Sequence, residues 1–374
     1  MNTFMKSEFT KEETSFLLDY LNTSTPCGHE ATGQKKWIEY IRPFVDTIYT
    51  DVYGTAVAVI NPKAAFKVAI EAHVDEISRL VQYISPEGLL YVIRNGWSDH
   101  QIAPSKTVWI HTSEWKKLKG VFWRPAIHTR KPKDAEMQPK QDTIFLDIGC
   151  KNKKEVEKLG VSVGDIVTYT DESFILNDRY FVGRSLDNKA WGFMIAQVAK
   201  AISKMKKKPS IWFYFINSVQ EEIGLRWAEM IAHSLKPNIV LCTDVTHDTT
   251  TPHINKIVEW DHACGAGPVL TRAPSVHNIL LKHIQQTAKK NKIPYQMAAA
   301  SYETGTDTES FAYSNGGTPS ALISLPLRYM HTTVESVQIS DVKHTADLLF
   351  QSAIALTADH SFSYHTPLVS RKKW

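Results

Sequence analysis

Short apolar runs rich in β-branched and aromatic residues alternate with helical segments after residue 185 of this chain. Because strands separated by helices pack as a sheet with helices on its faces, this pattern predicts an α/β domain. Before residue 77, two further apolar runs have the composition of buried strands, and two segments have the spacing of apolar residues that is typical of helices. Strands are expected at 56–60, 66–71, 211–216, 239–244 and 321–325, and helices at 11–22, 31–41, 190–205, 226–234, 278–291 and 341–356.

Residues 77 to about 169 have a different pattern. Short strand-like runs alternate with turns there, and only one helical segment is evident, at 153–159. A length of 374 residues suits two domains. We therefore expect a small β-rich domain at 77–169, inserted between the two parts, 1–76 and 170–374, of the α/β domain. The polar stretch 130–141, rich in Pro and Lys, is expected to be a loop.

Charge and composition exclude several classes of protein. Lys and Arg number 43 against 39 Asp and Glu, and a net charge of +4 is too small to predict a nucleic-acid or membrane partner. No apolar run reaches the ~18–20 residues of a membrane-spanning helix, and the first residues lack the apolar core of a signal peptide. A cytoplasmic location is therefore expected. The scattered cysteines are expected to be reduced thiols: Cys27, Cys150, Cys242 and Cys264.

Residues able to bind a metal follow four of the expected strands and open one helix. Open α/β sheets bind ligands outside the carboxyl ends of their strands, so these side chains are expected to meet at one edge of the sheet. Imidazole and carboxylate ligands suit a pair of divalent ions, and zinc, cobalt and manganese all accept them. The residues are His73 and Asp75, the pair Glu221 and Glu222, Asp244, His331, and Asp187 at the start of a helix.

Local spacing adds to this interpretation. In an extended segment His73 and Asp75 point to the same face, so the carboxylate can orient the imidazole. Glu221 and Glu222 are neighbours and point apart, so one can bind metal while the other acts as a general base. A general base typically raises the reaction rate by roughly 10²–10⁴-fold. A carboxylate can also bridge two ions about 3.5–4 Å apart, between which the bound water has a lowered pKa.

Each motif taken singly has a simpler explanation. A histidine at a strand end is often a hydrogen-bonded structural residue, a Glu-Glu pair at a helix start interacts with the helix dipole, and Asp-Asn there is a common N-cap. The combination favours a metal site, because the groups follow separate strands at the same ends.

Six motifs occur in the order seen in the M42 metallopeptidases, and the chain resembles that family from about residue 15 to 349. They are AHVDE, LDNKAWG, VQEEIGLRWA, TDV, the Gly305-Thr306-Asp307 segment and LPLRYMH. The family comprises enzymes like glutamyl aminopeptidase and tetrahedral aminopeptidases, some of them labelled endoglucanases. The resemblance implies a three-layer α/β/α metallopeptidase domain of the phosphorylase/hydrolase-like type. It further implies an inserted small β-barrel, PDZ-like and used in dimerisation, and a homo-oligomer that is a dimer or a hollow dodecamer.

The resemblance also implies a role for each residue of the expected site. Two divalent ions per subunit are implied, with zinc, cobalt or manganese as candidates. Glu221 is implied as the general base, and Asp75 as the carboxylate that supports a ligand histidine. The implied ligands are His73 and Asp244 for one ion, Glu222 and His331 for the other, and Asp187 as the bridge.

Four positions fall outside that pattern or have no settled role. Trp191 and Trp227 stand where relatives usually have Gly, and filling of the core is favoured over a reshaped substrate pocket. Ala266 stands where relatives often have a basic residue, which leaves substrate preference open. His128 resembles a family histidine, and a surface or packing role is favoured over one near the active site.

The function expected from these residues is a metal-dependent aminopeptidase that releases amino-terminal residues from short peptides. One alternative is a related amidohydrolase that removes an acyl group from a modified amino acid. Another is a metal-binding homologue that keeps the ligands and has altered or lost turnover. A glycan hydrolase is a weaker alternative, because that chemistry needs two carboxylates at a sugar bond and no metal.

Overall fold

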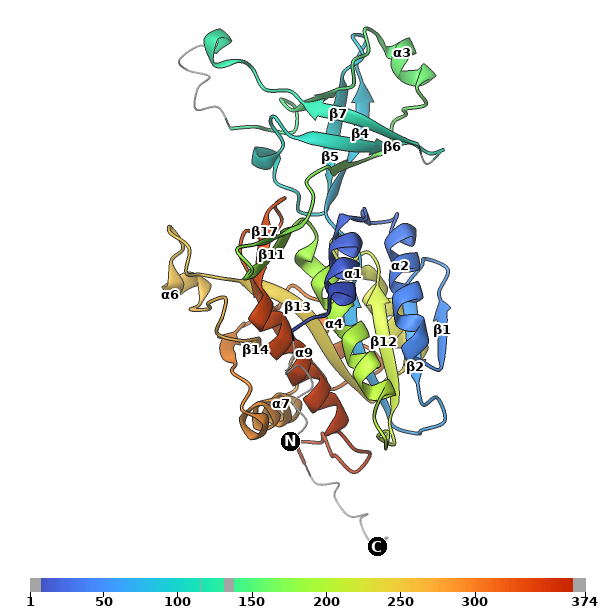
Figure 1. The fold of residues 1–374 in the computed structure, drawn as a ribbon, viewed down its shortest axis with the longest axis vertical. Coiled ribbons are helices and arrows are strands. Elements are labelled where there is room, and N and C mark those ends of the chain that lie inside the picture. The colour runs from blue at the N-terminus through green and yellow to red at the C-terminus, as the bar shows by residue number, and fades with distance from the viewer. Residues whose placement is uncertain (1–7, 115, 131–137, 366–374) are drawn as a thin grey trace, which may run out of the picture.

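The computed structural model describes residues 8–114, 116–130 and 138–365. It has a larger lobe built on an eight-stranded sheet and a smaller lobe formed by a closed barrel (Figure 1). Most of the stretch predicted as a loop at 130–141 lies outside the described residues.

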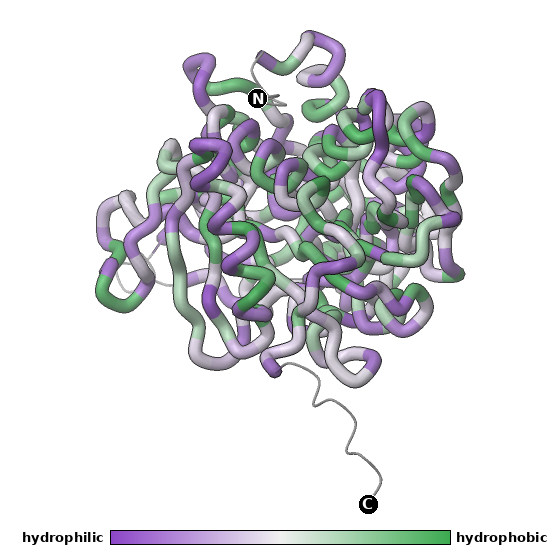
Figure 2. The backbone as a smooth tube through the Cα atoms, turned by 90° about the horizontal axis from the view of Figure 1, so that it is seen from below, coloured by the Kyte–Doolittle hydropathy of each residue, from purple (hydrophilic) through white to green (hydrophobic). Residues whose placement is uncertain are grey.

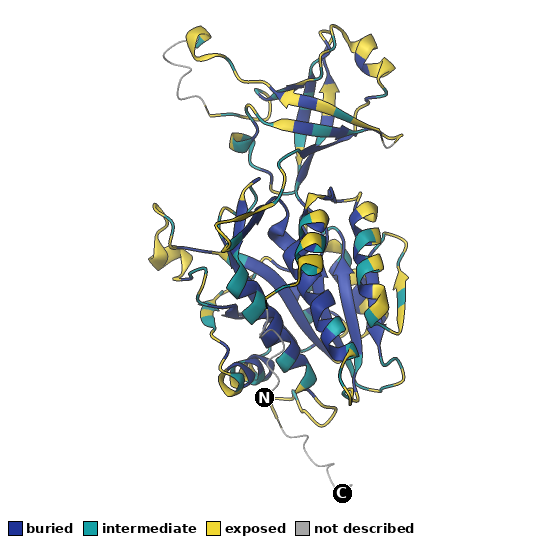
Figure 3. Ribbon diagram, viewed as in Figure 1, coloured by how far each residue is buried: buried dark blue, intermediate teal, exposed yellow. Residues whose placement is uncertain are grey.

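The large sheet has the strand order β1-β2-β12-β3-β13-β16-β14-β15. Its four middle strands β12, β3, β13 and β16 run parallel, so their carboxyl ends lie at one edge. These strands are buried on both faces, as their mostly apolar runs predict (Figure 3). The bounds are β1 (Thr47–Thr50), β2 (Ala56–Ile60), β3 (Lys67–His73), β12 (Trp212–Ser218), β13 (Ile239–His247), β14 (Val269–Arg272), β15 (Gln296–Ala299) and β16 (Ser320–Leu327).

Helices cover both faces of this sheet. One core contains residues of α1, α2, α4, α7 and α9 together with Val68 and Ile70 of β3, whereas Ala69 of the same strand packs with α5 and α8 on the other side. The three-layer α/β/α architecture is therefore confirmed. The helices are α1 (Lys11–Asn22), α2 (Ala31–Ile41), α4 (Leu186–Ser203), α5 (Arg226–Leu235), α6 (Lys256–Glu259), α7 (Asn278–Asn291), α8 (Thr308–Ala312) and α9 (Ile339–Ile354), with the 3-10 turn η1 (Arg42–Phe44).

The small lobe is a barrel that closes in the order β4-β5-β8-β7-β6-β9 and has its own apolar core. Its outer helix and its loops are largely exposed (Figure 3). The inserted small barrel is confirmed, and we propose the expected limits 77–169 as its domain boundary. Its elements are β4 (Ser78–Ile84), β5 (Leu90–Asn95), η2 (His100–Ile102), β6 (Thr107–His111), β7 (Lys117–Phe122), η3 (Ile127–Thr129), β8 (Phe145–Asp147), α3 (Lys153–Lys158) and β9 (Ile166–Tyr169).

A second, three-stranded sheet lies where the chain returns from the barrel to the large lobe. It has the order β10-β11-β17, formed by β10 (Phe174–Leu176), β11 (Tyr180–Gly183) and β17 (Glu335–Gln338). The pairing of β11 with β17 joins the segment that enters α4 to the segment that follows β16. Two parts of the chain about 150 residues apart are thereby held together beside the edge of the large sheet.

Polar residues are frequent in the outer loops, and apolar residues are frequent in the interior of the large lobe. Seen from below, several outer loops are hydrophilic, while hydrophobic stretches run through the body of the large lobe (Figure 2). Among the described residues, no helix is long and apolar enough to cross a lipid bilayer.

Candidate metal centre

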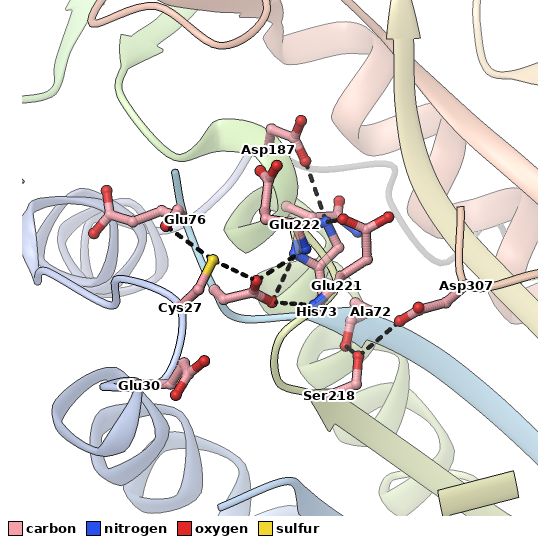
Figure 4. Close-up of polar contacts among 12 residues, drawn as sticks. Cys27, Glu30, Ala72, His73, Glu76, Asp187, Ser218, Glu221, Glu222 and Asp307 are labelled. Atoms are coloured by element: carbon pink, nitrogen blue, oxygen red, sulfur yellow. Dashed lines mark hydrogen bonds and ion pairs between the residues drawn. The ribbon is translucent and has the colours of Figure 1, made fainter. Parts of the chain in front are cut away.

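The residues expected to bind metal converge at the carboxyl edge of the parallel strands. His73 is the last residue of β3, and Asp244 lies near the end of β13. Glu221 and Glu222 follow β12, His331 follows β16, and Asp187 is the second residue of α4. The close-up shows Asp187, Glu221, Glu222 and His73 around one centre (Figure 4).

The carboxylate of Asp187 lies between the two imidazoles. Its Oδ1 is 3.2 Å from Nε2 of His73, and its Oδ2 is 3.2 Å from Nε2 of His331. The possible ligand atoms form two groups, each within 4.8 Å: His73, Glu221 and Asp244 in one, and Asp187, Glu222 and His331 in the other. This arrangement can hold two ions with one carboxylate between them.

Asp75 fixes the groups on either side of it. Its Oδ1 is 3.3 Å from Nδ1 of His73 and accepts the backbone N–H of Glu221 at 3.0 Å. Its Oδ2 accepts the backbone N–H of Glu222 at 3.1 Å and the thiol of Cys27 at 3.1 Å. One buried carboxylate therefore sets the position of an imidazole and of the neighbouring Glu-Glu pair.

Charge in this site supports occupation by cations. Burial and the neighbouring negative charge of Asp187 raise the pKa of Glu222 and of Asp244. Burial also raises the pKa of Glu221, against the attraction of His73. For Asp187, burial is outweighed by the hydrogen bonds of His331 and His73, which hold its pKa below the usual range. Several buried carboxylates this close together need compensating positive charge, and nitrogen and oxygen donors of this kind fit divalent ions.

Left-handed backbone conformations surround the same centre. Ser185 precedes the Asp187 segment with φ 58°, Gln220 precedes the Glu-Glu pair with φ 61°, and His331 itself has φ 59°. Residues other than Gly rarely adopt this conformation, and such strain is typical of functional sites.

Sequence reasoning missed Glu335 of β17. Its carboxylate accepts the backbone N–H of Asp187 at 3.1 Å and that of His331 at 2.9 Å. The side chain is buried, and burial and the charge of Asp187 raise its pKa. No local signal distinguishes this glutamate, because its role depends on the pairing of β11 with β17.

None of the four positions without a settled role lines the cavity that lies beside the candidate metal ligands. Trp191 is fully buried, and its Nε1 donates to the backbone oxygen of Asp244. Trp227 is half-buried, and its Nε1 donates to Asp51 at 2.8 Å. Neither indole lines the cavity beside the metal centre, and among its described lining residues neither Ala266 nor His128 occurs. These positions support filling of the core over a reshaped pocket for both tryptophans.

That cavity has a volume of about 490 Å³ and opens directly onto the candidate metal-binding groups. The remaining wall comes from six segments: the barrel loop after β5, the loop between β12 and α5, the end of β13, the residue that follows α6, the loop before α8 and the loop after β16. Side chains from these segments include Trp97, His247, Trp260, Glu303 and Met330. A site of this size can admit the end of a peptide beside two metal ions.

Comparison with known proteins identifies what the chain resembles. The family model described as M42 glutamyl aminopeptidase matches residues 54–348. A curated protein from Acetivibrio thermocellus, named "Putative aminopeptidase", is 31% identical over 328 residues, which cover 87% of this chain and 93% of the relative. The lysyl aminopeptidase of Pyrococcus furiosus is 27% identical over 322 residues, with 86% and 91% covered.

Solved structures give the same picture for the fold. The TET1 peptidase of Pyrococcus horikoshii, described as assembling into a tetrahedron or a large octahedral shell, superposes with a TM-score of 0.80 at 22% identity. The likeness covers 92% of this chain and 100% of that one.

Proposed function

The chain belongs to the M42 glutamyl aminopeptidase family and is a metallo-aminopeptidase, and from this premise we propose that it uses two divalent ions to release single amino-terminal residues from short peptides. The observation that carries the proposal is the position of Asp187 between two imidazoles, with further carboxylates on either side.

Five side chains would hold the ions. One ion would be bound by His73 and Asp244, the other by Glu222 and His331, and Asp187 would bridge them. When bound, the ions would polarise the scissile carbonyl and lower the pKa of a water molecule between them. Zinc, cobalt and manganese all suit these ligands.

Glu221 would act as the general base. Its carboxylate lines the cavity and lies 3.7 Å from Nε2 of His73, farther than that of Asp187. The hydrogen bond from its backbone N–H to Asp75 fixes its position. It would accept a proton from the attacking water and pass it to the leaving amine.

The test is hydrolysis of a pool of short peptides, half of them with acetylated amino termini, with added zinc, cobalt or manganese and with EDTA. We expect loss of single residues from the free peptides only, abolished by EDTA and read by mass spectrometry. The Glu221→Gln variant should bind metal normally and lose about 10²–10⁴-fold in kcat. Near-normal turnover by this variant with metal bound would refute the assignment of the base.

The same assay separates the alternatives. Release of acyl groups from blocked substrates would indicate an amidohydrolase of another specificity. Tight metal binding with no hydrolysis of any amide would indicate a homologue without turnover. The burial of Trp191 behind Asp244, away from the cavity, favours an active enzyme over this last alternative.

We further propose a homo-oligomer assembled through the barrel, either a dimer or a dodecamer. The assembly described for the Pyrococcus horikoshii relative supports this proposal. Light scattering coupled to size exclusion would test it, since a monomer at micromolar concentration would contradict it. Cytoplasmic location stays a prediction.

A further inference from the structure

The part of the cavity not used for metal binding has one sign of charge. Of the described residues that line the cavity, none is Lys or Arg. Once the metal ligands and Glu221 are set aside, the one remaining carboxylate among these lining residues is Glu303. The wall available to a substrate side chain is therefore negative.

Two indoles face the same space. Trp260 donates its Nε1 to the backbone oxygen of Ala299 at 2.8 Å, and its ring stacks on His262 with centroids 6.1 Å apart. Ala299 lies four residues before Glu303, so this hydrogen bond ties the indole to the segment that carries the carboxylate. Trp260 is 38% exposed in the free protein, which leaves part of its surface open to a ligand.

The second indole comes from the barrel. Trp97 is 74% exposed and lines the cavity after Gly96. A Cβ placed on Gly96 would lie 3.4 Å from Cβ of Glu222, so the barrel loop passes directly beside a metal-binding residue. A side chain entering the cavity next to the metal centre therefore meets aromatic surface from both lobes.

We propose that this cavity selects peptides whose amino-terminal residue has a long cationic side chain, Lys or Arg, and disfavours Glu and Asp. The inference rests on the aminopeptidase function proposed above. A cation is attracted both by the face of an indole and by a carboxylate, and its aliphatic stem packs on aromatic surface. An acidic side chain would meet no Lys or Arg among the described lining residues and would be brought close to the carboxylate of Glu303.

Release of amino-terminal Glu, the activity for which the family is named, would need other residues in the wall of this cavity. Recognition of a carboxylate requires an Arg, a Lys or a group of N–H donors within hydrogen-bond distance. The described lining residues supply neither positively charged side chain. Family membership therefore indicates which reaction the chain catalyses, whereas Glu303, Trp97 and Trp260 determine which amino-terminal residue it prefers.

The decisive substrates differ only at the end of the first side chain. Lys and norleucine share a four-carbon stem, and only Lys has the ammonium group. With the metal-loaded enzyme we expect kcat/KM for a Lys substrate to exceed that for norleucine by at least about tenfold, with Glu slowest; one tenfold step is about 1.4 kcal/mol. Added salt should reduce the preference, because the attraction is partly electrostatic.

Variants assign the preference to its residues. Glu303→Gln should reduce the ratio of kcat/KM for Lys over norleucine about tenfold, and Glu303→Lys should raise the relative rate for Glu. The matched control is Glu259→Gln, which removes an exposed carboxylate near the cavity that does not line it. The control should leave the ratio unchanged.

Three results distinguish failure of the proposed selectivity from failure of the proposed aminopeptidase function. Equal losses for Lys and norleucine in Glu303→Gln would overturn the inference, since Glu303 would then bind the α-ammonium group that every substrate has. Hydrolysis of Glu or norleucine substrates as fast as Lys would overturn it while leaving the proposed function intact. Binding of lysinamide more tightly than norleucinamide by calorimetry, with no hydrolysis of any substrate, would support the selectivity and overturn the proposed function.

Discussion

Replacement of Trp191 by Phe tests whether the indole behind the metal centre positions Asp244. Trp191 is fully buried in α4, among the residues of the larger apolar core. Its Nε1 donates to the backbone oxygen of Asp244, a residue of the proposed metal site. Phe keeps an aromatic ring at this position and removes the donor. The substitution therefore separates the hydrogen bond from most of the packing.

The expected loss follows from two contributions. A buried carbonyl that loses its donor costs about 1–3 kcal/mol, and the smaller ring leaves a partial cavity worth about 1 kcal/mol more. We expect the metal-free variant to lose about 2–4 kcal/mol in the free energy of unfolding. A less constrained Asp244 should also weaken metal binding by about 10–100-fold, as loss of a supporting contact does at other metal sites.

The matched control is Trp227→Phe. This indole also donates to a carboxylate, but it is half-buried, and the Oδ1 atom of its acceptor Asp51 is held by three backbone N–H groups. Its replacement should cost under about 1 kcal/mol and leave metal affinity unchanged. Urea denaturation of the metal-free proteins gives the free energies, and calorimetric titration with zinc gives the affinities. Equal losses in the two variants, or unchanged metal affinity in Trp191→Phe, would refute the positioning role.

Two further substitutions test neighbouring parts of the site. Asp75→Asn should weaken metal binding about 10–100-fold and lower kcat, because it removes the charge beside His73; zinc titration and steady-state kinetics measure both, and unchanged values would contradict the role given to Asp75. Burial opposes ionisation of Glu76, but Arg184 and Lys189 lower its pKa from 4.5 to about 2. Its contribution to stability is thus present above about pH 4.5 and is lost as the pH falls towards 2. Glu76→Gln should accordingly be less stable than the parent at pH 7, with the gap in urea midpoint closing as the pH falls; a gap independent of pH would contradict this reading.

The large sheet and the ends of its central strands could be predicted because their signals are local. The runs that became β2, β3, β12, β13 and β16 are mostly apolar, since each strand is buried on both faces. The position and the end of such a strand can be predicted from its own residues, without knowledge of the strands that pair with it. Most of the metal-binding candidates lie at or just after those ends, Asp187 lies at the start of α4, and the structure brings all of them to one centre. Their roles as ligands and base stay predictions.

The small sheet at the junction had no such signal. β10, β11 and β17 have three or four residues each, and the residues of β10 are exposed. β11 pairs with β17 across about 150 residues, and nothing in either segment indicates the other. Glu335 takes its position from that pairing, so the support it gives to Asp187 and His331 follows from tertiary structure alone.

The proposed catalysis and the proposed selectivity therefore have different structural origins. The proposed metal ligands lie at or just after the ends of buried strands and at the start of a buried helix, where packing fixes the backbone. Trp97, Trp260 and Glu303 stand on connecting segments, and the first of these belongs to the barrel. Segments of that kind tolerate substitution because little of the core depends on them. Selectivity can thus change within the family while the metal centre is retained, and a preference for cationic residues needs no alteration of the sheet that carries the chemistry.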